Sequence, residues 1–169
     1  MSDAATPIHS RAVAAIVDLL DRERLMTLAC NRPDGWPQAT TVGYLNDGLN
    51  LYFIIARTSQ KFANLQADSR VSVAIRSESG RGGAGVGVSM AGRTVEVADP
   101  DVVERLNQLV AERYPEVHVY CPSADAVAVM HFRPTVISAV GVAHGRSDAE
   151  TFTLGESETG SGSHLVSPV

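Results

Sequence analysis

Lysine is nearly absent from this chain: thirteen of its fourteen basic residues are arginine, and Lys61 is the only lysine. The formal net charge is −5 and no basic stripe is visible, so nucleic acids and anionic membrane surfaces are excluded as partners. No apolar run reaches about 18 residues, which excludes a membrane-spanning helix. Residues 1–11 lack the basic-then-apolar order of a signal peptide, and we therefore expect a cytoplasmic protein.

Cysteine is scarce as well. Cys30 and Cys121 show no CxxC spacing and no matching pair of histidines, so the sequence contains no zinc motif and we expect reduced thiols. Neither a Ser-His-Asp arrangement nor a working pair of carboxylates can be identified from residue spacing. The sequence therefore assigns no metal ligand and no catalytic residue.

The apolar content is sufficient for a single domain. The chain has 169 residues, of which 44% are hydrophobic, and this is enough for one core and too short for two comfortable domains. We place the domain at residues 1–154. Residues 155–169 are acidic and rich in glycine and serine, a composition typical of a mobile tail.

Hydrophobic periodicity predicts few helices and many short strands. We expect helices at residues 10–22, from about residue 58, and at 101–114. Asp99 caps the last of these, whose expected buried face is Val102, Val103, Leu106, Leu109 and Val110. We expect strands at 24–32, 36–45, 49–56, 70–77, 88–98, 126–132, 135–143 and 150–154.

The turns between these strands indicate how they pair. The first three are joined by "PDG" and "NDG", sequences typical of tight hairpins, and should form an antiparallel meander. Gly92 inside the fifth strand suggests a β-bulge. Six to eight short antiparallel strands with few helices indicate a mainly β, α+β fold built around a small barrel.

The only lysine occupies an unusual place. Thr58 or Ser59 serves as N-cap of the helix that follows the strand ending at Ala56, so Lys61 lies in the first helical turn. The helix dipole disfavours a cation there by about 0.3–1 kcal/mol, and Arg57 adds to the same positive potential. A bound phosphate explains this arrangement, because free amide N–H groups, hydroxyls and an ammonium group are its usual surroundings. A solvated surface lysine is the alternative.

The stretch from residue 56 to residue 75, "ARTSQKFANLQADSRVSVAI", resembles the corresponding segment of the FMN-binding split-barrel family, which includes the pyridoxamine 5'-phosphate oxidases and general-stress proteins. The shared features are Ser-x-Lys after an apolar strand, Asn-Leu in the helix, and Arg-Val-Ser at the start of the next strand. The likeness covers about residues 15–140. It implies a six- to eight-stranded antiparallel split β-barrel with flanking helices that binds FMN as a homodimer, with the cofactor at the interface.

Carried over position by position, the resemblance implies two groups of cofactor-binding residues. The phosphate would lie at Arg57, Thr58, Ser59, Gln60 and Lys61. The ribityl chain and the ring would be bordered by Thr40, Thr41, Val42, Ile54, Ile55 and Ala56.

Three functions follow from the resemblance. The first is an FMN-dependent oxidoreductase that moves hydride or electrons between NAD(P)H and a small acceptor. The second keeps the fold but binds the deazaflavin F420, which needs more basic groups for its long anionic tail, or heme, which needs an axial ligand such as His131 or His144. The third is a flavin-binding sensor or stress protein without turnover.

Overall fold

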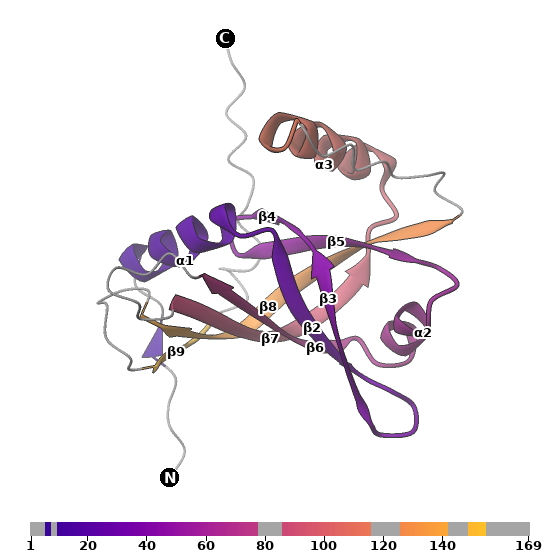
Figure 1. Cartoon of the computed structure of the whole chain (residues 1–169), viewed down its shortest axis with the longest axis horizontal. Helices are drawn as coiled ribbons and strands as arrows, with labels where there is room; N and C mark the ends of the chain where they lie inside the picture. Colours follow the sequence, from indigo (N-terminus) through magenta and orange to yellow (C-terminus); the bar gives the residue numbers. More distant parts are fainter. Residues whose placement is uncertain (1–5, 8–9, 78–85, 116–125, 142–148, 155–169) are drawn as a thin grey trace.

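The computed structural model describes residues 6–7, 10–77, 86–115, 126–141 and 149–154. Figure 1 shows the helices arranged around one strongly curled sheet. The helices are α1 (Ser10–Arg22), α2 (Gln60–Ala67) and α3 (Pro100–Arg113). The strands are β1 (Thr6–Pro7), β2 (Leu25–Asn31), β3 (Pro37–Gly43), β4 (Leu45–Asp47), β5 (Asn50–Ala56), β6 (Arg70–Ser77), β7 (Val86–Glu96), β8 (Val127–Val140) and β9 (Ala149–Thr153). None of the described helices is long and apolar enough to cross a membrane.

The sheet curls into a split barrel, as the sequence predicts. Its main path runs β3-β2-β6-β7-β8-β9, all antiparallel, and the two-residue β1 pairs parallel to β9. Along one edge β8 pairs with β7; along its other edge the first half pairs with β5 and the second half with β9. β3 and β5 approach one another without forming a ladder, and this gap is the split in the barrel.

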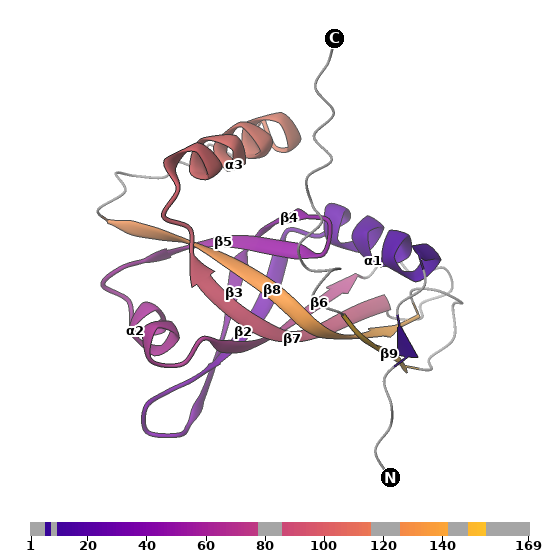
Figure 2. The same cartoon turned by 180° about the vertical axis from the view of Figure 1, so that it is seen from behind.

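Alternating side chains fill the barrel. In β6 every second residue is buried, so that Val71, Val73 and Ile75 point inward while their neighbours face solvent. Ile16 and Leu20 of α1 are fully buried and close one end of the core. Each such side chain contributes about 1.5–3 kcal/mol through burial. The two views place α1 and α2 at opposite ends of the barrel (Figures 1 and 2).

Both predicted turns are present, but the meander they were expected to build is interrupted. Gly35 and Gly48 have φ of 85° and 58°, values that favour glycine. β3 pairs with β2 and ends at Gly43, after which the short β4 pairs with β5. The expected single strand 36–45 is therefore wrong. Tyr44 breaks it, because its side chain is buried and its hydroxyl donates to the Leu20 carbonyl oxygen at 2.9 Å.

The two strands expected on either side of Arg133-Pro134 are one continuous strand, β8. Pro134 is tolerated because it lies opposite Gly92, where the register of the β7–β8 ladder shifts. The β5 ladder ends at Phe132 and the β9 ladder begins at Val136, so neither of these strands requires an N–H group from Pro134. The predicted bulge at Gly92 is confirmed.

α3 begins as predicted, with Asp99 as N-cap and Pro100 in its first turn. Its expected buried face is wrong, because no residue of α3 is buried and the five apolar residues named above are only half-buried. The helix is tied down at its C-terminal end, where Arg113 donates to the Asn46 carbonyl oxygen at 2.9 Å. Both views show α3 apart from the barrel on the side of β5 (Figures 1 and 2).

Candidate functional site

The turn between β5 and α2 is built around Ser59. Its hydroxyl donates to the Ala56 carbonyl oxygen at 2.7 Å and accepts the Phe62 N–H at 3.2 Å, which confirms it as the N-cap. The amide groups of Gln60 and Lys61 lie ahead of the first intrahelical bond, and the helix supplies no acceptor for them. The turn therefore presents amide donors at the positive end of α2.

Arg57 directly follows β5 and contacts a residue of β7, on the other side of β8. Its guanidinium forms an ion pair with Glu96 at the end of β7, and it also lies over the ring of Phe62, 5.6 Å from the ring centroid. The side chain of Arg57 is 35% exposed and that of Glu96 is 27% exposed. Arg57 thus has a carboxylate partner, and its charge is largely balanced within the chain.

Lys61 is in a different situation. Its side chain is half-buried, and this burial lowers the pKa of the ammonium group, while the nearby Cys30 thiol acts in the opposite direction. Within the described residues, Lys61 makes no ion pair with a carboxylate. A partly desolvated cation without a counter-ion fits an anionic ligand.

Amide side chains connect α2 to the hairpin of β2 and β3. Gln60 donates to Asn64 Oδ1 at 2.9 Å, and the fully buried Asn64 donates to Gln38 Oε1 at the same distance. The Cys30 thiol lies 3.9 Å from both Gln38 Oε1 and Asn64 Nδ2. These linked amides fix the first turn of α2, and with it Lys61, against the start of β3.

The predicted residues of β3 divide between two faces. Thr40 and Val42 lie opposite Leu28 and Met26 of β2 and share their inward face, whereas Thr41 is exposed on the outer face. Thr40 Oγ1 is buried and is the only such side-chain atom without a hydrogen-bond partner in the described part of the chain. A buried hydroxyl without a partner costs free energy, so its position requires a reason.

The predicted residues of β5 divide in the same way. Ile55 is buried in the barrel, while Ile54 and Ala56 lie on the outer face, which leads toward the turn at Thr58, itself exposed. The structure thus brings Ser59, Gln60 and Lys61 together at one turn. It does not bring all of the predicted residues to one surface.

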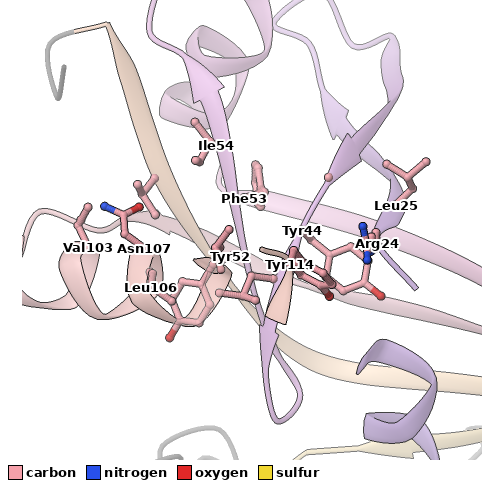
Figure 3. A pocket seen from close by; sticks show the side chains of 14 residues that line it. Arg24, Leu25, Tyr44, Tyr52, Phe53, Ile54, Val103, Leu106, Asn107 and Tyr114 are labelled. Carbon is pink, nitrogen blue, oxygen red and sulfur yellow. The ribbon is translucent and has the colours of Figure 1, made fainter. Parts of the chain in front are cut away.

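A cavity of about 420 Å³ lies between α3 and the outer face of β5 (Figure 3). Figure 3 shows Leu106 close to Tyr52, and the side chains of Arg24, Tyr44 and Tyr114 gathered at one end. The Arg24 guanidinium lies 4.2 Å from the centroid of the Tyr114 ring. Apart from Ile54, none of the predicted site residues lines this cavity. In the sequence, the cavity is indicated by the apolar stripe of α3, which the periodicity predicts to be a buried packing face.

His131 has partners on both ring nitrogens. Nδ1 accepts from Arg133 Nε at 3.4 Å, so Nε2 carries the hydrogen and donates it to Asn50 Oδ1 at 3.0 Å. The ring stacks on Tyr52 with 4.5 Å between the centroids. Burial lowers the pKa of His131 to about 4, and the adjacent Arg133 contributes. His144 lies outside the described residues, and the described part of the chain has no cluster of potential metal ligands.

Comparisons with known proteins agree with this fold. A family model described as pyridoxamine 5'-phosphate oxidase matches residues 12–141. No curated protein matches the chain. A heme-binding protein from Mycobacterium smegmatis is 23% identical, with a TM-score of 0.67; the match covers 85% of this chain but only 59% of that protein.

Two further solved structures carry different cofactor names. An F420 reductase is 26% identical, with a TM-score of 0.58, and the match covers 72% of this chain and 94% of the reductase. A FAD-binding protein from Mesorhizobium loti is 20% identical, with a TM-score of 0.60, and the match covers 80% of this chain and 96% of that one. Proteins of this fold therefore include binders of heme and of flavin-type cofactors.

Proposed function

The chain belongs to the pyridoxamine 5'-phosphate oxidase family, and on that premise we propose that it is an FMN-binding oxidoreductase whose cofactor phosphate lies at the turn of residues 57–61. The observation that carries the proposal is the state of Lys61. Its ammonium group is half-buried and meets no carboxylate among the described residues. A phosphate would supply the missing negative charge and accept the amide hydrogens of Gln60 and Lys61.

The other residues of the turn would position the phosphate rather than neutralise it. Ser59 fixes the start of α2, and the amides of Gln60 and Asn64 hold the first helical turn in place. From the turn, the outer face of β5 leads through Ala56 and Ile54 to the cavity beneath α3. We propose that this cavity shields the redox centre from water. The bound flavin would supply hydride transfer between NAD(P)H and a small acceptor.

We also propose that the protein is a homodimer with the cofactor at the interface. Among the described residues, three large apolar side chains are exposed in the single chain, namely Leu25 (61%), Trp36 (73%) and Val95 (50%). The strand β3 is also an edge of the described sheet, in which it forms a ladder with β2 alone. Both features favour a second chain that covers them. Light scattering after gel filtration tests this proposal, and a monomer at about 10 µM would contradict it, since stable dimers bind more tightly than this.

F420 is a second candidate, favoured by the 26% identity to an F420 reductase. Charge favours FMN, because Arg57 is already paired with Glu96 and Lys61 alone remains for an anion at this turn. That arrangement suits one phosphate better than a longer anionic tail. Heme is less well supported, because both ring nitrogens of His131 have partners.

The absorption spectrum and mass spectrum of the purified protein test the cofactor directly. We expect the purified protein to be yellow and to release FMN on denaturation. Protein from which the cofactor has been removed should be colourless and should recover the flavin absorption spectrum when it is incubated with FMN. A spectrum obtained only with F420 or only with heme would contradict the proposal. NADH or NADPH oxidation above the background of free FMN would then separate an oxidoreductase from a flavin-binding sensor without turnover.

A further inference from the structure

Three arginines form a row across the outer face of the sheet. Arg70 of β6 is the register partner of Arg93 of β7, and Arg93 is the register partner of Arg133 of β8. Direct partners in antiparallel strands point to the same face, and neighbouring strands lie about 4.8 Å apart. All three side chains are exposed. The chain therefore holds three positive charges side by side, an arrangement that destabilises a sheet unless something neutralises it.

Within the part of the chain that the structure describes, one of the three guanidinium groups has a carboxylate partner. Arg70 is held by Asp68 through its Nε and Nη2 atoms, with a shortest distance of 2.7 Å, and this pairing keeps the pKa of the Asp68 carboxyl well below its usual range. Arg93 donates to the Ser69 hydroxyl at 3.1 Å, and Arg133 donates to the neutral ring of His131. Within the described residues, two charges of the row thus lack a counter-ion.

A hollow of about 470 Å³ adjoins this row. Arg70 and Arg93 both line it, and the small side chains of Ala29, Ser72 and Ala91, which are register partners on β2, β6 and β7, lie on the same outer face. Small residues leave room directly beside the guanidinium groups. The volume is within the range of small-molecule sites, which is about 300–1,000 Å³.

We propose that this row is a second anion site, which binds a small molecule carrying a diphosphate group through Arg93 and its register partner Arg133. Arg93 also lines the hollow, which leaves room for the rest of the molecule, while Arg133 lies outside the lining, on the neighbouring strand. The planar guanidinium matches phosphate oxygens in pairs, and two neighbouring arginines suit two linked phosphates. The site is separate from the turn at Lys61, which does not line the hollow. The inference therefore does not depend on the proposed cofactor.

Inorganic pyrophosphate is the probe, used in thermal melts and calorimetric titrations of the full-length chain. Arg93→Gln and Arg133→Gln should each weaken pyrophosphate binding about tenfold, because each removes a charge-assisted hydrogen-bonding group. Without pyrophosphate, both variants should melt at or above the wild-type temperature, because like charges are removed from the row. Arg76→Gln is the matched control: Arg76 is exposed on the same strand and the same face as Arg70, but six residues away.

Three comparisons decide the proposal. Lys61→Ala should bind pyrophosphate as tightly as wild type at the site that Arg93→Gln weakens about tenfold, and this separates the row from the proposed cofactor site. The inference would be overturned if Arg93→Gln and Arg133→Gln both bound pyrophosphate as wild type does. It would also be overturned if Arg76→Gln weakened binding as much as they do. The dissociation of a dimer by Arg93→Gln or Arg133→Gln in light scattering would overturn it too, because the row would then face a second chain instead of a ligand.

Discussion

Arg57 and Glu96, at the ends of the two strands that flank β8, form an ion pair although they are 39 residues apart in the sequence. The pair joins the end of β7 to the turn that precedes α2. The pair also sets the charge of that turn, because Glu96 balances Arg57, whereas Lys61 meets no carboxylate among the residues that the structure describes. The electrostatic contribution to anion binding at this turn therefore depends on a carboxylate outside the motif.

Glu96→Gln tests this dependence. Removal of the carboxylate releases the guanidinium of Arg57 and raises the local positive potential, so FMN should bind about three- to tenfold more tightly at low salt. The gain should disappear as the salt concentration rises. Quenching of FMN fluorescence gives the dissociation constant. Glu104→Gln is the control, because it removes a carboxylate at an exposed position of α3 and should leave FMN affinity unchanged. Weaker FMN binding by Glu96→Gln would contradict the prediction and would show that Arg57 acts only when it is paired with Glu96.

Gly92→Ala should destabilise the barrel strongly. A Cβ atom at residue 92 would lie 2.0 Å from the Arg133 carbonyl oxygen, a contact that only a shift of the backbone can relieve. We expect the free energy of unfolding to fall by about 2–4 kcal/mol. Gly43→Ala is the control, because its nearest contact would be an ordinary 3.8 Å. Urea denaturation measures both, and equal stability of the two variants would be inconsistent with a close approach of β7 and β8.

Local chemistry in the sequence predicted several elements well. The caps at Ser59 and Asp99, the turns at Gly35 and Gly48, and the bulge at Gly92 each depend on residues close to one another in the chain. These features follow from hydrogen bonds and backbone preferences that act over a few residues. The strand-to-helix turn of the candidate site belongs to this class.

Features that depend on distant partners could not be predicted. No local signal shows that Glu96 meets Arg57, or that Arg113 ties α3 to Asn46. The apolar stripe of α3 predicted burial, yet periodicity reports only that a face is apolar and not how far it lies from the sheet. Likewise, Pro134 ends a strand in most contexts, and only the bulge opposite it explains why β8 continues.

The free energy of unfolding should decrease as the pH is lowered, because His131 then takes up a proton. Its pKa is lowered from 6.5 to about 4 in the folded chain, so the unfolded chain binds more protons between these values, and stability is lost as pH falls through this window. The contribution is about 1–2 kcal/mol, allowing for the solvent screening of a half-buried ring. His131→Gln should lose this part of the pH dependence. Identical pH profiles for wild type and variant would rule the contribution out.

Thr40→Val should have opposite effects with and without cofactor. The buried Thr40 hydroxyl has no partner in the described part of the chain, so its replacement by a methyl group should stabilise the cofactor-free protein by about 1 kcal/mol. If the hydroxyl serves the cofactor, the same variant should gain less thermal stability from FMN than the wild type does. Thr27→Val, at an exposed position of β2 outside the predicted cofactor-binding residues, should change neither value.

The central claim is that Lys61 holds the phosphate of a flavin, and titration of the protein with FMN tests it most directly. Lys61→Ala should raise the dissociation constant of FMN at least about tenfold, because a charge-assisted contact in a partly desolvated site is lost. Riboflavin, which lacks the phosphate, should bind wild type and variant equally. Equal affinity of wild type and Lys61→Ala for FMN would contradict the claim.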